Sequence, residues 1–178
     1  LVFAMPGDSI TDVHASINTG SSTKTISTTG TVNTSSAISK FYGTSIDYSA
    51  TNGSNHNTVA GNADFDFGTG DYTVEWWQYW DDFTGYQGIW DVGYSTLLLQ
   101  SVAGEGRWYV YVAGTDIIQE STAATVDEWT HYALVRNGTT VTLYRNGIST
   151  GSATSSSSHG SSTNDLSIGA DSGDYYFR

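Results

Sequence analysis

The sequence predicts an all-β protein, a sandwich or barrel of short antiparallel strands. More than a quarter of its residues are Ser or Thr, and it has 20 Gly, 12 Tyr, 6 Trp and 6 Phe. Thr, Val, Tyr and Trp suit a partly buried strand, whereas Gly, Asn, Asp and Ser suit the turns between strands. Strong helix formers are scarce, and no stretch repeats its apolar residues with the 3.6-residue period of a helix.

The length, charge and lack of Cys of the chain limit the classes of protein to which it can belong. A chain of 178 residues suits one domain, and at that size roughly 70% of the unfolded surface can be buried. The lack of Cys excludes a disulfide scaffold and a cysteine nucleophile. With 18 acidic and 6 basic residues the net charge is −12, which repels nucleic acids and anionic lipids. No apolar run reaches the roughly 20 residues that cross a bilayer, so we expect no nucleic-acid partner and no membrane insertion.

The first part of the chain, residues 1–40, carries few large apolar groups. We expect irregular, Ser/Thr-rich short edge strands there, because Ile26, Val32 and Ile38 recur at regular spacing. Disorder is the alternative for residues 20–39. Two further strands are expected between residues 41 and 59.

The clearest single strand is DYTVEWWQYWDD, residues 71–82. Its side chains alternate between two faces, one with Thr73, Glu75, Trp77 and Tyr79 and the other with Val74, Trp76, Gln78 and Trp80. Because aromatic side chains occur on both faces, the pattern predicts a strand in the middle of a packed sheet. Residues 87–100 are predicted to form two strands around residues 93–95, and residues 107–112 another alternating strand.

The strongest local signal is a pair of Arg-Asn-Gly sequences nine residues apart. Asn-Gly supplies the positive φ angles of a type I′ turn, so we predict three consecutive antiparallel strands at 129–136, 140–145 and 148–153. Arg136 and Arg145 would then lie at the hairpin tips, where we expect them to be exposed and to aid solubility. A strand at 166–168 follows a Ser-rich loop.

Four blocks of sequence carry a family resemblance: ADFDFGTGDYTVEWW (63–77), DEWTHYALVRNG, the LYRNG hairpin and LSIGADSGDYYFR. Together they resemble the laminin-G-like, concanavalin-A-like jelly rolls. The resemblance is weak over residues 1–40 and good over residues 41–178. It implies a two-sheet antiparallel jelly-roll β-sandwich that spans residues 1–178 as a single domain.

The chain departs from that family at its end. Members usually continue with a strand of the G-x-I-D-D-V-R kind, which pairs with the N-terminal strand. This sequence stops at Arg178 without such a strand. We therefore expect a fragment of a longer chain, whose closing C-terminal strand is missing or shared. The sheet edge beside Leu1 to Met5 would then be open to strand pairing with another chain or to homo-oligomerisation.

Two catalytic interpretations lack the groups that they require. Gly7-Asp8-Ser9-Ile10-Thr11 matches the nucleophile block of GDSL-type ester hydrolases, which would make Ser9 an acyl-transfer nucleophile. That chemistry needs a His base paired with a carboxylate, and no His lies in the D-x-x-H pattern of those hydrolases. Retaining glycosidases need two carboxylates about 5–5.5 Å apart, usually from an E-x-D-x-E strand that is missing here. We expect no enzymatic activity.

A calcium ion is the most plausible cofactor, because carboxylate and carbonyl oxygens around Gly suit a hard cation. The resemblance implies one calcium at a sandwich edge. The candidate ligands flank the FGTG loop or lie in the loop before it: Asp47, Asn52, Asp64, Asp66 and Asp71. The alternative is that these residues make hydrogen bonds within turns.

The many aromatic residues suggest carbohydrate binding, because the C–H faces of sugars stack on aromatic rings. The candidate ligand-binding residues are Trp80, Tyr86, Trp90, Tyr94, Tyr109 and Tyr111. The alternative is that the indoles fill the space between two sheets, which applies above all to Trp76, Trp77, Trp108 and Trp129.

The function that we expect is non-catalytic surface display or attachment. Blocks of the FDFGTGDYTVEWW type look like those of bacteriophage virion proteins and of bacterial surface proteins. We therefore favour a virion structural component, a tail-fibre or capsid-decorating domain that contacts glycans or neighbouring protein subunits. The alternative is a secreted carbohydrate-binding or cell-adhesion domain of a larger bacterial protein. Both interpretations place the chain outside the cell or on a virion surface.

Overall fold

The computed structural model describes residues 1–17, 21–48, 55–93 and 96–171. In chain order its elements are the 3₁₀ helix η1 (His14–Ser16), β1 (Ile26–Thr29), β2 (Asn33–Ser35), β3 (Ser45–Asp47), β4 (His56–Val59), the 3₁₀ helix η2 (Ala63–Phe65), β5 (Asp66–Gly68), β6 (Tyr72–Tyr79), β7 (Gln87–Val92), β8 (Leu97–Ser101), β9 (Trp108–Val112), β10 (Thr115–Gln119), β11 (Trp129–Asn137), β12 (Thr140–Arg145), β13 (Ile148–Thr154), β14 (His159–Gly160) and β15 (Leu166–Ile168). No helix in these ranges is long and apolar enough to span a membrane.

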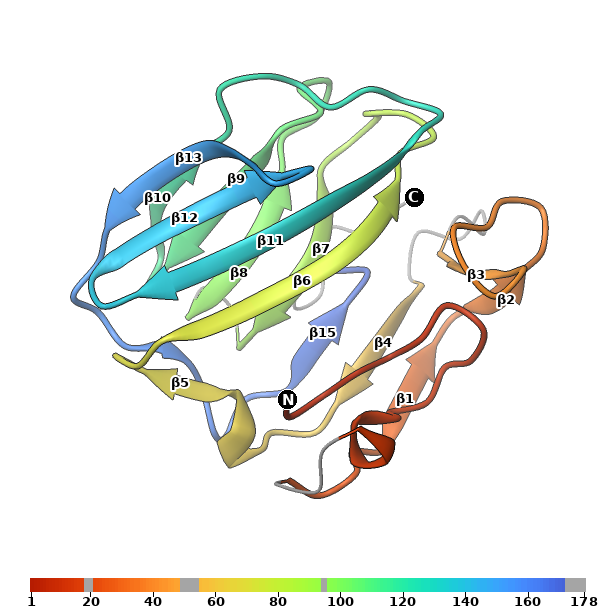
Figure 1. Cartoon of the computed structure of the whole chain (residues 1–178), viewed down its shortest axis with the longest axis horizontal. Coiled ribbons are helices and arrows are strands. Elements are labelled where there is room, and N and C mark those ends of the chain that lie inside the picture. Colours follow the sequence, from red (N-terminus) through yellow and green to blue (C-terminus); the bar gives the residue numbers. More distant parts are fainter. Residues whose placement is uncertain (18–20, 49–54, 94–95, 172–178) are drawn as a thin grey trace.

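Two antiparallel sheets lie face to face, as the sequence predicts (Figure 1). Within the described residues the large sheet has the strand order β1-β4-β15-β7-β8-β9-β10, and the small sheet has the order β13-β12-β11-β6. The pairs β14–β5 and β2–β3 form two short ribbons at opposite ends of the molecule in Figure 1. Strands far apart in the sequence become neighbours, since β15 lies between β4 and β7.

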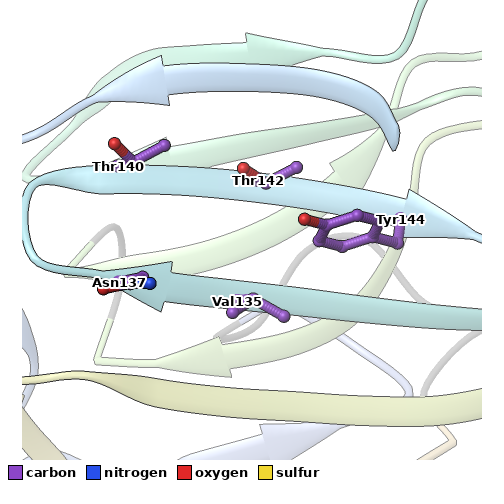
Figure 2. Close-up of a pocket in the computed structure, with 5 residues that line it drawn as sticks. All are labelled: Val135, Asn137, Thr140, Thr142 and Tyr144. Atoms are coloured by element: carbon purple, nitrogen blue, oxygen red, sulfur yellow. The ribbon is translucent and has the colours of Figure 1, made fainter. Parts of the chain in front are cut away.

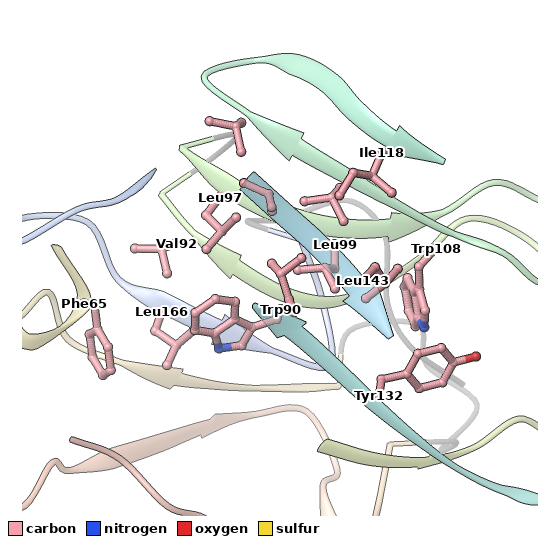
Figure 3. Close-up of a cluster of buried hydrophobic side chains, with 14 of the residues drawn as sticks. Phe65, Trp90, Val92, Leu97, Leu99, Trp108, Ile118, Tyr132, Leu143 and Leu166 are labelled. Atoms are coloured by element: carbon pink, nitrogen blue, oxygen red, sulfur yellow. The ribbon is translucent and has the colours of Figure 1, made fainter. Parts of the chain in front are cut away.

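The space between the sheets is filled by aliphatic and aromatic side chains (Figure 3). The rings of Trp80 and Trp108 lie 4.9 Å apart between centroids, and Trp76 stacks on Tyr132 at 5.3 Å. Burying one side chain of Leu or Phe size stabilises a fold by about 1.5–3 kcal/mol. The indoles of Trp76 and Trp108 therefore belong to the core, as the packing interpretation predicts, whereas Trp77 and Trp129, which it also names, are not core residues.

The predicted hairpins are confirmed as β11, β12 and β13, with one difference in turn type. Asn146 and Gly147 both have positive φ, 49° and 78°, and form the predicted type I′ turn. At the first tip Asn137 pairs with Thr140 and still belongs to β11. Only Gly138 in that turn has a positive φ, of 59°, which is the type II′ pattern.

The prediction for β6 is correct in its alternation and wrong in its position. Trp76 faces the core, whereas Trp77 points to the outer surface and is 40% exposed. In the described part of the chain β6 has a single strand neighbour, β11, and therefore lies at the edge of the small sheet. The outer aromatic face is only partly covered, because Phe41 meets the Trp77 ring edge-on at 5.6 Å.

The N-terminal region is ordered through a few anchors. Ile26 and Val32 contact the core and Ile38 is 36% exposed, and of the three residues expected in strands only Ile26 lies in one, β1. Residues 1–5 belong to no strand: the Ala4 carbonyl accepts a hydrogen bond from the Val13 N–H at 2.8 Å, and the Phe3 ring packs against the core. Completion of an open sheet edge by another chain remains a prediction.

Arg145 differs from the expectation of an exposed solubility residue. Its guanidinium donates to the Glu120 carboxylate, with the nearest N–O distance 2.7 Å. The Glu120 side chain has no exposed surface, and it also accepts a hydrogen bond from the Trp108 N–H at 2.8 Å. The ion pair therefore joins the second hairpin to the segment that follows β10.

Candidate functional site

A shallow hollow lies on the outer face of the small sheet, over β11 and β12. Its volume is about 410 Å³, and it is lined by Val135, Asn137, Thr140, Thr142 and Tyr144. Figure 2 shows these side chains on the solvent side of the two strands, with the Tyr144 ring at one end and Asn137 and Thr140 at the other.

The strand register explains why these residues gather. Across β11 and β12, Asn137 pairs with Thr140, Val135 with Thr142, and Ala133 with Tyr144. Successive outward residues of a strand are two positions apart, so each of these pairs contributes to the outer face. Ala133 and Val135 are short side chains next to the large Tyr144 ring, and this difference in height leaves the hollow.

The chemistry of the hollow combines one aromatic ring with neutral polar groups. The side chains supply an amide from Asn137 and hydroxyls from Thr140 and Thr142. The Thr142 hydroxyl lies 3.2 Å from the Ser152 hydroxyl of β13, which extends the polar surface across the next strand. Such a surface can bind an uncharged ligand that presents both C–H faces and hydroxyl groups.

A buried cation holds the hairpin tip beneath the hollow. Arg136 is only 1% exposed, which corrects the expectation that it is a surface residue. Its guanidinium donates to the carbonyl oxygens of Gly138 at 3.0 Å, Gly68 at 3.2 Å, Ser157 at 2.8 Å and Ser155 at 3.2 Å. Because side chains alternate along a strand, Arg136 points inward between the outward residues Val135 and Asn137. The sequence pattern of the hairpin does not reveal this role.

His159 completes the support beneath the hollow. Its Nδ1 lies 2.8 Å from the Tyr72 hydroxyl and its Nε2 lies 3.0 Å from the Ser155 hydroxyl. Burial, followed by the charge of Arg136, lowers the pKa of His159 to about 4. The imidazole is therefore neutral at physiological pH and acts as a structural hydrogen-bonding group.

Three of the aromatic residues predicted to bind a ligand gather on the other sheet. The Tyr109 and Tyr111 rings stack with centroids 6.4 Å apart on the outer face of β9. Tyr86, which is 44% exposed, is close enough to contribute to the raised pKa of Tyr111, after burial and Asp116. The hydrogen bond to Glu105, followed by burial, raises the pKa of Tyr109 to about 12. Tyr109 is only 9% exposed, so Tyr86 and Tyr111 contribute most of this second candidate surface.

The other predicted aromatic residues do not join either surface. Trp80 has no exposed surface and Trp90 is 9% exposed; both belong to the core cluster. Packing therefore accounts for these two indoles. Tyr94 lies outside the described residues.

The predicted calcium ligands do not form one cluster. Asp47 ends β3, at the opposite end of the molecule from Asp66 on β5 (Figure 1). Asp64 accepts hydrogen bonds from Lys24 and then Ser21, which lower the pKa of its carboxyl, and the Asp71 carboxylate accepts the Gly138 N–H at 2.7 Å.

Asn52 lies outside the described residues. Among the residues that the structure does describe, no group of three or more His, Asp or Glu is arranged to hold a metal ion. Calcium binding remains a prediction.

Among the described residues, the contacts of Ser9 include no His base of the kind that an ester hydrolase requires. The Ser9 hydroxyl pairs with that of Thr11 at 2.8 Å. His14 and Asp12 do form a buried pair at 2.8 Å, a contact that the sequence analysis missed. The remaining ring nitrogen of His14 lies 3.1 Å from the Ser21 carbonyl, so both nitrogens are engaged. This pair anchors the N-terminal segment.

Comparison with known proteins identifies the class of this fold. A family model described as the concanavalin A-like lectin/glucanases superfamily matches residues 51–178. The chain therefore belongs to the concanavalin A-like lectin/glucanase superfamily, as the sequence blocks indicate. No curated protein sequence matches the chain significantly.

Solved structures with the same fold include several carbohydrate-binding domains. Domain 4 of AbnA, a GH43 extracellular arabinanase from Geobacillus stearothermophilus solved in complex with arabinotriose, has a TM-score of 0.63 and 17% identity, over 88% of this chain and 77% of that one. The binding domain of botulinum neurotoxin DC in complex with SialylT has a TM-score of 0.55 and 9% identity, over 90% of this chain and 40% of that one.

A structure of botulinum neurotoxin type C, a toxin whose cell entry depends on interaction with two ganglioside molecules, has a TM-score of 0.59 and 10% identity to this chain. The match covers 94% of this chain and 41% of the toxin chain. The chain thus spans well under half the length of the toxin chains that it matches. At these identities the likeness shows the fold.

Proposed function

We propose that this chain is a non-catalytic glycan-binding module, and that the hollow on the small sheet is its ligand site. The observation that carries the proposal is the combination of the Tyr144 ring with neutral hydrogen-bonding side chains in one surface depression (Figure 2). A pyranose or furanose ring has C–H faces that pack on an aromatic ring, and its hydroxyls bond to amides and hydroxyls. The arabinanase domain with bound arabinotriose supports this ligand class.

The chemistry of the lining favours binding over catalysis. Glycoside hydrolysis requires an acid and a base or nucleophile, normally a pair of carboxylates. The five side chains that line the hollow are Val, Asn, Tyr and two Thr. They can orient a sugar, but they supply neither carboxylate.

The test is binding to a glycan array, followed by calorimetry with the best ligand. Tyr144→Ala removes the stacking ring and is expected to weaken binding at least about tenfold, or about 1.4 kcal/mol. Tyr144→Phe keeps the ring and serves as the matched control, and Thr142→Val removes one hydroxyl at constant shape. Thermal unfolding of each variant checks that the fold is intact.

The tyrosine surface on the large sheet supplies the competing outcome. If Tyr111→Ala abolishes binding while Tyr144→Ala leaves it unchanged, the site lies on β9 and the assignment to the hollow is wrong. If no glycan binds to the wild-type chain, the proposed function is wrong.

The setting of the module extends the proposal. We place it on an exterior surface, in the first instance that of a virion, where it would engage glycans or neighbouring subunits. Electron microscopy of the parent particle or cell with an antibody against the chain tests this. Labelling of a tail fibre or capsid supports the virion setting, whereas labelling of a cell surface supports an adhesion domain.

A further inference from the structure

From the charges around the hollow we infer that it selects uncharged oligosaccharides and rejects those that carry a carboxylate or sulfate. This inference rests on the proposed function and names the class of glycan that the same site would bind.

The first observation concerns the residues beside the hollow. Glu75 on β6 pairs with Ala133 on β11, which in turn pairs with Tyr144 on β12. The backbone of Glu75 is therefore two strand spacings, or about 10 Å, from that of Tyr144. Its side chain is 68% exposed on the outer face, where the carboxylate lies 3.6 Å from the Nε2 of His131. At the other end, Asp71 is held against the hairpin tip by its bond to the Gly138 N–H. Both carboxylates lie on the β6 side of the hollow, near its two ends, where they would repel an anionic ligand.

The second observation concerns the basic residues in the part of the chain that the structure describes. Four of them are neutralised or buried: Lys24 pairs with Asp64, Arg107 with Glu105, Arg145 with Glu120, and Arg136 faces backbone carbonyls. The fifth, Lys40, has its ammonium over the Trp77 ring, 4.2 Å from the centroid. Trp77 lies further along β6 than Glu75, on the side away from the hollow. None of these five Lys and Arg side chains lines the hollow.

The third observation is the overall charge. A net charge of −12 on one small domain produces a negative potential that repels anionic ligands before contact. At physiological salt the Debye length is about 8 Å, so nearby carboxylates act on a ligand more strongly than distant ones. The local and overall fields have the same sign, and we expect about a fivefold preference for the neutral glycan of a matched pair.

The test uses an array that carries neutral oligosaccharides and their sialylated or sulfated counterparts in pairs. For the wild-type chain the neutral member is expected to bind about fivefold more tightly, and the ratio should shrink at high salt. Glu75→Lys should bring the two affinities closer together. Asp116→Lys makes the same charge change on an exposed residue of β10 in the large sheet, and should leave the ratio nearly unchanged.

The outcomes separate this inference from the function on which it rests. Equal or tighter binding of the acidic members by the wild-type chain overturns the inference and leaves glycan binding standing. An equal effect of Asp116→Lys and Glu75→Lys also overturns it, because selection would then not arise at the hollow. Binding of neither class overturns the proposed function, and the inference with it.

Discussion

Acidification should weaken the fold through His159, the buried imidazole beneath the hollow. Its pKa is lowered from 6.5 to about 4, so the unfolded chain takes up a proton at a pH where the folded chain still excludes it. The contribution of His159 to stability is complete above pH 6.5 and is lost as the pH falls toward 4. A pKa difference of about 2.5, at about 1.36 kcal/mol per pKa unit, corresponds to a loss of about 3 kcal/mol.

The assay is urea denaturation between pH 7 and pH 4, for the wild type and for His159→Gln. Carboxyl groups also titrate in this range, so the informative quantity is the difference between the two pH dependences. The wild type should lose about 3 kcal/mol more than the variant, which retains an amide but no titrating group. Thr142→Val, which changes no titrating group, is the control and should keep the wild-type slope. Equal slopes for wild type and His159→Gln would refute the account of a neutral buried His159.

Three further perturbations test other contacts. Glu120→Gln should destabilise the fold by about 3–5 kcal/mol in urea denaturation, because it leaves Arg145 without its charged partner. The double variant Glu120→Leu with Arg145→Met should recover most of that loss, and no recovery would contradict the explanation. Burial, followed by the charges of Asp47, Asp127 and Asp82, raises the pKa of Asp81, so its ionised form destabilises the fold at neutral pH. Asp81→Asn should therefore raise the unfolding temperature at neutral pH, and this gain should fade in acid. The unfolding temperature should be higher in calcium than in EDTA, and the double variant Asp66→Asn, Asp71→Asn should lose that difference. Equal unfolding temperatures of the wild type with and without calcium would contradict the metal prediction.

Local sequence signals predicted the parts of the fold that depend on neighbouring residues. The Asn146-Gly147 pair determines its own turn, because both residues must adopt positive φ there. Alternation along residues 72–79 likewise identified which side chains face the core, because a strand has a period of two. The sequence blocks of the superfamily supplied the sandwich as a whole.

The errors arise where the answer depends on distant partners. Alternation shows the faces of β6 but not its place in the sheet, so the exposed ring of Trp77 was assigned to a sheet interior. The buried position of Arg136 depends on carbonyl partners from its own hairpin turn, from β5 and from the loop after β13, which the hairpin sequence does not show. The calcium ligands were grouped by proximity in sequence, whereas the fold separates Asp47 from Asp66.

The hollow itself could not be predicted from any single segment. It depends on the pairing of Ala133 with Tyr144 and of Val135 with Thr142, which places short side chains beside a large ring. The Asn-Gly signal alone would make Asn137 and Gly138 the two turn residues and would pair Arg136 with Thr139, whereas the structure pairs Asn137 with Thr140.

The most direct measurement is an NMR titration of the labelled chain with the best neutral oligosaccharide from the array. If the hollow is the ligand site, the largest shifts of backbone amides will lie in residues 133–144 and in the strands on either side. Shifts confined to β9 and β10, around Tyr109 and Tyr111, or a spectrum that does not change at saturating sugar, would contradict that assignment.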